Sequence, residues 1–122
     1  MLTAQPGAAE YGPGQPRELR MVVANVGLVP CRRDLDPALQ EMVVLAADGA
    51  RLWSSNDCYG RGGFSERVLQ PGEQLVSSVV WGGRTSQPGC PAQREAVPAG
   101  DYQLVAKLGQ LTSPPAAFRL LG

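Results

Sequence analysis

The stretch YQLVAKL, residues 102–108, carries the clearest structural signal in this sequence of 122 residues. Tyr102, Leu104, Ala106 and Leu108 fall at every second position, and Gln103, Val105 and Lys107 lie between them. A period of two puts alternate side chains on opposite faces of an extended chain, so one face is buried and the other meets solvent. The stretch therefore predicts a half-buried β-strand.

Six more short apolar runs lie along the chain, at residues 19–24, 41–47, 52–53, 67–70, 74–81 and 116–121. The turn pair Asp48-Gly49 separates the second run from the third, and Pro71-Gly72 separates the fourth from the fifth. Short strands at regular spacing with turn residues between them are typical of a sandwich or a barrel. We therefore predict an all-β protein, an immunoglobulin-like antiparallel β-sandwich of about seven strands.

Residues 1–16 differ in composition from the rest of the chain. They are rich in proline and glycine and carry few apolar side chains. Such a composition buries too little surface to offset the entropy of ordering it. We expect residues 1–16 to be a flexible linker or arm, and residues 17–122 to form one sandwich domain, which suits the chain length.

The charges of the chain balance, with eleven basic and eleven acidic side chains. A neutral protein has no net field that attracts nucleic acid or an anionic membrane, so we expect a protein or cell-envelope partner and no nucleic acid. No apolar run approaches the roughly 18 residues of a spanning helix, so this chain is not expected to insert into a membrane. We expect a targeting segment or membrane anchor upstream of it.

The three cysteines fall in three long connections, residues 25–40, 54–65 and 82–100. If every predicted strand reverses direction relative to the one before it, all three connections lie at the same end of the sandwich. Cys31, Cys58 and Cys90 would then be close enough for any two of them to form a disulfide.

We favour a disulfide between Cys58 and Cys90, because each follows a strand that ends near a tryptophan and each lies in a glycine-rich connection. Cys31 would be the unpaired thiol, either buried or joined to another chain. A disulfide indicates an extracytoplasmic location, in the cell envelope or secreted. The alternative is that all three cysteines are reduced in a cytosolic protein.

The chain contains no histidine. This removes the usual general base, the common hydrolase triads and the commonest metal ligand. The cysteines are also too widely spaced for a zinc site. We therefore expect no catalytic residue, no metal and no cofactor.

Aromatic and cationic residues gather in the same long connections as the cysteines. Aromatic side chains and arginine dominate binding hot spots, and the loops at one end of a sandwich commonly carry recognition. The predicted binding residues are Tyr59, Arg61, Phe64 and Arg84. The alternative is that Trp53, Trp81 and Phe64 close the core instead.

Four segments carry a resemblance to known families: LWSSNDC at 52–58, LQPGE at 69–73, WGGRTS at 81–86 and AGDY at 99–102. Their order resembles that in extracytoplasmic immunoglobulin-like domains of high-GC Gram-positive bacteria. More distantly it resembles the sandwich of the Bacillus intracellular proteinase inhibitor. The first resemblance implies a domain tethered behind a membrane segment, and the second implies protease binding through a loop.

The sequence thus predicts a non-catalytic extracytoplasmic binding or adaptor domain that recognises a cell-envelope or protein partner through long loops at one end. Two alternatives stay open. One is a protease inhibitor of the Bacillus type, and the other is a structural spacer in a membrane-anchored protein.

Overall fold

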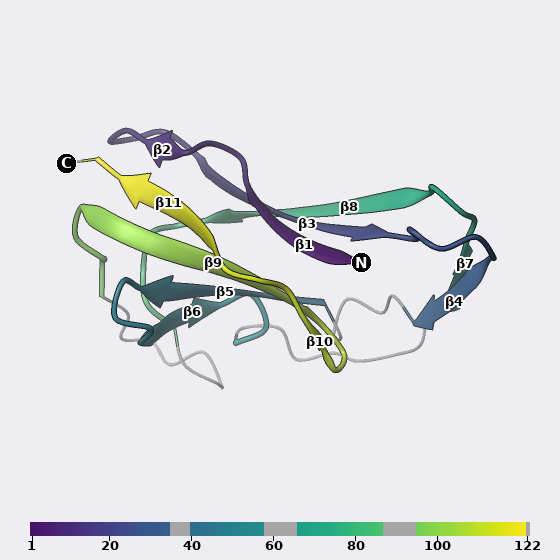
Figure 1. Ribbon diagram of the computed structural model, residues 1–122. Coiled ribbons are helices and arrows are strands. Elements are labelled where there is room, and N and C mark those ends of the chain that lie inside the picture. Colours follow the sequence, from purple (N-terminus) through teal and green to yellow (C-terminus); the bar gives the residue numbers. More distant parts are fainter. Residues whose placement is uncertain (35–39, 58–65, 87–94, 122) are drawn as a thin grey trace.

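Two facing β-sheets form the body of the molecule, and a small two-stranded sheet lies at one end (Figure 1). The computed structural model describes residues 1–34, 40–57, 66–86 and 95–121. Every regular element in these ranges is a strand or a turn. The all-β sandwich predicted from the sequence is confirmed.

The three-stranded sheet has the order β1-β3-β8, and the large sheet has the order β2-β11-β9-β5-β6, with β10 added to β9. The small sheet pairs β4 with β7. All pairings are antiparallel except that of β2 with β11. The strands are β1 (Leu2–Pro6), β2 (Glu10–Tyr11), β3 (Arg17–Ala24), β4 (Cys31–Asp34), β5 (Gln40–Ala46), β6 (Arg51–Ser54), β7 (Glu66–Leu69), β8 (Gln74–Trp81), β9 (Gly100–Leu108), β10 (Leu111–Thr112) and β11 (Ala116–Leu120).

Each of the seven predicted runs coincides with a strand of the structure, to within about two residues at either end. The four strands that the sequence did not predict are β1, β2, β4 and β10. Two of these have only two residues, too few for a period of two to be recognisable in the sequence.

The core lies between the two main sheets and follows the alternation seen in the sequence. The inward side chains of β9 are Tyr102, Leu104, Ala106 and Leu108, and all are buried. The inward side chains of β5 and β11 lie beside them in the same sheet, and those of β1 and β3 face them from the other sheet, so one cluster joins both sheets. Burial of this apolar surface is the main stabilising term of the fold.

Trp53 and Trp81 belong to this core. Their ring centroids are 6.0 Å apart, and Trp81 also packs edge-on against Tyr102 and Phe118. Trp81 is 1% exposed. The two tryptophans therefore close the core rather than contact a partner.

The structure corrects the prediction of a flexible arm over residues 1–16. β1 pairs with β3 along its whole length, and Leu2, Ala4 and Tyr11 are buried. The Tyr11 hydroxyl also donates a hydrogen bond to the carbonyl oxygen of Glu18 at 2.5 Å. The domain therefore includes the first residues of the chain, because three inward side chains outweigh the proline and glycine content around them.

The structure also corrects the predicted strand directions. β3 and β8 were expected to run the same way, but they are antiparallel neighbours, with Arg17 opposite Trp81 and Ala24 opposite Gln74. The prediction treated β7 as a strand of the sandwich. Because β7 instead pairs with β4 outside the two main sheets, it adds no change of direction between β6 and β8, and β8 runs opposite to β3. The connection that follows Trp81 therefore begins at the end of the sandwich where β3 starts, opposite to the end where β3 finishes.

Cys31 is therefore separated from the start of that connection by the length of the sandwich. It is the first residue of β4, it is half-buried, and its thiol is free. Its partner across the small sheet is Leu69. The prediction that all three long connections lie at one end of the sandwich is therefore wrong for the start of the connection that begins at residue 82.

Candidate functional site

A buried polar cluster lies where β6 ends, and we call it the Asp57 cluster. Its central group is the carboxylate of Asp57, whose side chain is 4% exposed. Arg51 donates from Nη2 to Oδ1 of Asp57 at 2.6 Å, and Ser86 donates from Oγ to Oδ2 at 2.5 Å. A buried carboxylate with a charged and a hydroxyl donor is well satisfied, which is the condition for burying it at low cost.

The cluster joins three segments of the chain. Ser54 N donates to Ser86 Oγ at 3.0 Å, and Ser86 N donates to the carbonyl oxygen of Leu52 at 2.9 Å. On its other side, the Ser54 hydroxyl donates to Oε2 of Glu41 in β5 at 2.5 Å. The segment after β8 is thereby fixed against the outer edge of β6.

Burial of the Asp57 carboxyl acts to raise its pKa, but the hydrogen bonds from Arg51 and Ser86 and the charge of Arg51 outweigh it. The net result is a pKa held below the ordinary value of 3.8. The group is therefore a stable anion at neutral pH, suited to hold its neighbours in place and unsuited to exchange protons there.

This geometry fixes where two segments outside the described residues begin. Residues 58–65 follow Asp57 directly, and residues 87–94 follow Ser86 directly. The Asp57 and Ser86 side chains are hydrogen-bonded, so the last described residue before each of the two segments lies next to the other. The second segment returns at Glu95, whose N donates to Thr85 Oγ1 at 3.0 Å.

Most of the predicted site residues lie in those two segments. Tyr59, Arg61 and Phe64, and the predicted disulfide partners Cys58 and Cys90, lie outside the described residues. They remain predictions.

Arg84 is the one predicted binding residue that the structure describes. It is exposed, and it pairs with Ala96 in a short antiparallel bridge beside the Asp57 cluster. Its carbonyl oxygen accepts a hydrogen bond from Nε1 of Trp81 at 2.9 Å. The backbone of Arg84 is thus tied to the core while its side chain lies at the surface.

Sequence reasoning did not identify the Asp57 cluster. The signal available was a strand of four residues with Arg51 at its start and Asp57 just beyond its end. Ser86 is distant in sequence and gives no local pattern, so only the folded chain shows that it completes the cluster.

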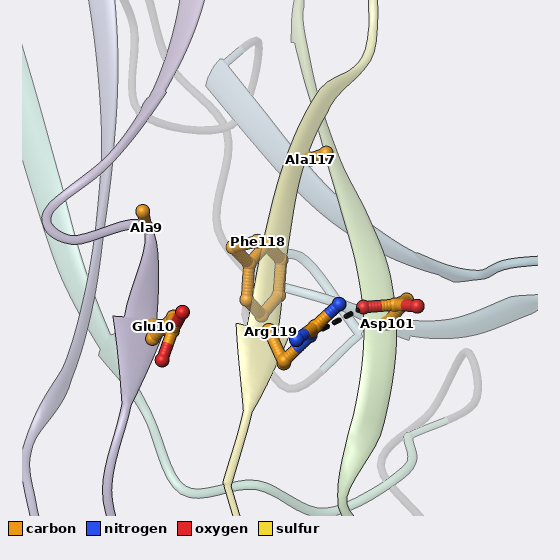
Figure 2. Close-up of a pocket in the computed structure, with 6 residues that line it drawn as sticks. All are labelled: Ala9, Glu10, Asp101, Ala117, Phe118 and Arg119. Carbon is orange, nitrogen blue, oxygen red and sulfur yellow. Dashed lines mark hydrogen bonds and ion pairs between the residues drawn. The ribbon is translucent and has the colours of Figure 1, made fainter.

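A second feature is a depression of about 350 Å³ between β2, β9 and β11, shown in Figure 2. Arg119 donates from Nε to Oδ1 of Asp101 at 2.8 Å, and Glu10 lies on the neighbouring strand. Asp101 and then Glu10 raise the pKa of Arg119. Both side chains of the ion pair are more than half exposed, and the one arginine of the depression is already paired with a carboxylate, which leaves no unpaired cation there to select an anionic ligand.

Residues 1–34, 40–57, 66–86 and 95–121 contain no group of three side chains suited to hold a metal ion. The same ranges contain no helix that is long and apolar enough to cross a membrane.

No protein-family model matches this sequence, and no curated protein matches it. Among solved structures, the chain is similar to part of the β-glucosidase EmGH1 from Erythrobacter marinus, at 17% identity and a TM-score of 0.55. A β-glucosidase from Listeria innocua matches at 8% identity and a TM-score of 0.51. The alkylpurine DNA glycosylase AlkC from Pseudomonas fluorescens matches at 11% identity and a TM-score of 0.51.

These matches cover nearly all of this chain but only 15%, 16% and 30% of the three larger proteins, in the order given. At such identities the likeness concerns the fold alone. It shows that a sandwich of this shape occurs as one part of larger proteins.

Proposed function

We propose that this chain is a non-catalytic extracytoplasmic binding module, which recognises a protein or cell-envelope component through the two segments that leave the fold beside the Asp57 cluster. The observation that carries the proposal is the hydrogen bond between Asp57 and Ser86. It gives two glycine-containing segments a common rigid base, and recognition loops on a rigid scaffold are the usual arrangement for binding.

The composition of the two segments favours a binding role. Residues 58–65 contain Tyr59, Arg61 and Phe64, and Arg84 lies on the flank of the other segment. Aromatic residues and arginine carry a large share of binding energy at protein interfaces. The core position of Trp53 and Trp81 leaves these four residues as the candidates for contact.

The test is capture of a partner from a cell-envelope extract by the immobilised protein. The variant Arg61→Ala with Arg84→Ala should lose most of the captured material. The matched control is Arg20→Ala with Arg119→Ala, which removes the same charge from strands β3 and β11 and should leave capture unchanged. If both double variants capture as the wild type does, the two segments are not the binding surface.

A titration of the same protein against serine and cysteine proteases distinguishes the inhibitor alternative, which predicts stoichiometric loss of protease activity. A protein that captures nothing and inhibits nothing acts as a spacer, and that result overturns the proposal.

A further inference from the structure

The two main sheets have four edges, and three of them are protected. β1 is short and ends at Pro6, and β2 has two residues, one of them Glu10. The third edge, β6, is covered by the segment that contains Ser86. Short strands, charges, proline and covering segments are the devices by which proteins prevent sheets from pairing edge to edge.

β8 forms the fourth edge, and the residues that the structure describes show none of these devices there. Its eight residues, QLVSSVVW, contain no charged residue, no proline and no glycine. In the part of the chain that the structure describes, β3 is its only strand partner. Long, uncharged edge strands of this kind are templates for a further strand.

The hydrogen-bonding direction of β8 follows from its neighbours. Ala24 N donates to the Met1 carbonyl oxygen and Gly7 N to that of Glu18, so the even-numbered residues of β3 bond to β1. The odd-numbered residues of β3 therefore bond to β8, where they lie opposite odd-numbered residues. The even-numbered residues of β8 direct their N–H and C=O groups toward the free edge, and these are Gln74, Val76, Ser78 and Val80.

The side chains of the same residues point away from the core. Val76 is 59% exposed and Val80 is 64% exposed. The free edge thus offers backbone hydrogen bonds and an apolar stripe together, which is unusual for a surface that faces only water.

We propose that β8 pairs with β8 of a second copy of this chain, antiparallel and about a two-fold axis at Ser78. In this register Ser78 faces Ser78 of the second copy, and Val76 faces Val80 of the second copy on both sides of the axis. Val76, Ser78 and Val80 are then each opposite a residue that also directs its backbone groups outward, as an antiparallel ladder requires. Four valines cover one another on the outer face, where each pair stabilises the contact.

The absence of charge in β8 favours this occupant. When two identical strands pair in antiparallel register, a charged residue near the two-fold axis lies close to the same residue of the other copy and is repelled by it. β8 contains no charged residue, so this repulsion does not arise. The contact also closes on itself, because a two-fold interface uses the same patch on both copies. The β1 edges that remain are short and end at Pro6, which prevents further growth of the sheet.

The test is sedimentation velocity over a range of protein concentrations. The wild type should sediment as a species of twice the 12.9 kDa chain mass. The variant Val76→Lys with Val80→Lys should be monomeric, because each lysine faces a lysine of the second copy. The matched control, Thr3→Lys with Gln5→Lys on the exposed face of β1 in the same sheet, should remain dimeric.

A charge-swapped variant tests the register and guards against loss of folding. Val76→Lys with Val80→Glu in one chain sets Lys against Glu on both sides of the axis, so the dimer should form again and weaken with added salt. A wild type that is monomeric at every concentration overturns the proposal. A double-lysine variant that still dimerises, or a charge-swapped variant that stays monomeric, overturns it as well.

Discussion

The edges formed by β6 and β8 are built in opposite ways. β6 is four residues long, begins with Arg51, and is covered by a segment that hydrogen-bonds to its backbone at Leu52 and Ser54. β8 is twice as long, uncharged, and has exposed valines beside its free backbone groups. One edge is closed by the chain itself, whereas the other is complementary to a copy of itself. An edge strand that lacks every protective device is a better indicator of an interface than exposure alone.

The largest expected effect concerns the closed edge. If Cys58 and Cys90 form a disulfide, reduction should lower the free energy of unfolding by about 3 to 4 kcal/mol, because the bond closes a long loop in the unfolded chain. The contact between Asp57 and Ser86 is compatible with this pairing, since Asp57 precedes Cys58 directly and Ser86 lies four residues before Cys90 in the chain. Urea unfolding with and without reductant measures the loss.

Thiol labelling checks the same prediction independently. The native protein should label once, at Cys31, and the reduced and denatured protein should label three times. Cys31→Ser should leave the difference between oxidised and reduced stability unchanged. Three labels before reduction would contradict the disulfide.

The next effect comes from the Asp57 cluster. Asp57→Ala leaves the Ser86 hydroxyl and the Arg51 guanidinium without their partner, and we expect a loss of about 2 to 3 kcal/mol in the free energy of unfolding. The control is Asp101→Ala, which breaks an ion pair whose carboxylate side chain is 66% exposed. Such exposed pairs contribute less than about 1 kcal/mol. Equal losses from the two variants, measured by urea unfolding, would show that the cluster is not the anchor of the β6 edge.

The smallest effect is a pH dependence of stability. The pKa of Asp57 is lower in the folded protein than in the unfolded chain, so the unfolded chain binds more protons as the pH falls. The stabilisation from Asp57 should be complete above about pH 5 and should decrease as the pH falls through about 4 toward the folded pKa. Asp57→Asn should lack this component, so the stability difference between the two proteins should shrink on acidification. A difference that stays constant from neutral pH to about pH 3 would contradict it.

The sequence predicted seven of the eleven described strands because their side chains alternate or form short apolar runs between turn residues. The alternation in residues 102–108 and 19–24 corresponds to inward side chains that the structure buries completely or nearly so. The sequence predicted neither β1 nor β2, because the prolines and glycines around Leu2, Ala4 and Tyr11 obscured three inward side chains. Composition averaged over sixteen residues cannot reveal a strand of five.

The candidate site was less predictable than the fold. The chain pattern indicated where long connections lie, but the reversal rule failed at β7, whose partner is β4 rather than a strand of a main sheet. The position of Ser86 against Asp57 depends on that path and has no local signature in the sequence. The sequence could not predict the free edge of β8 either, because an edge is defined by which strands pair and not by the residues of the strand itself.

By itself, the sequence determined the all-β class, most of the strands and the inward side chains, because a period of two is a local property of an extended chain. Only the tertiary structure decided that the first residues join the sheet, that β3 and β8 run antiparallel, that Asp57 anchors the segment after β8, and that β8 has no second strand partner among the described residues. These features depend on contacts between residues far apart in the chain, and no local pattern specifies which strand becomes the neighbour of which.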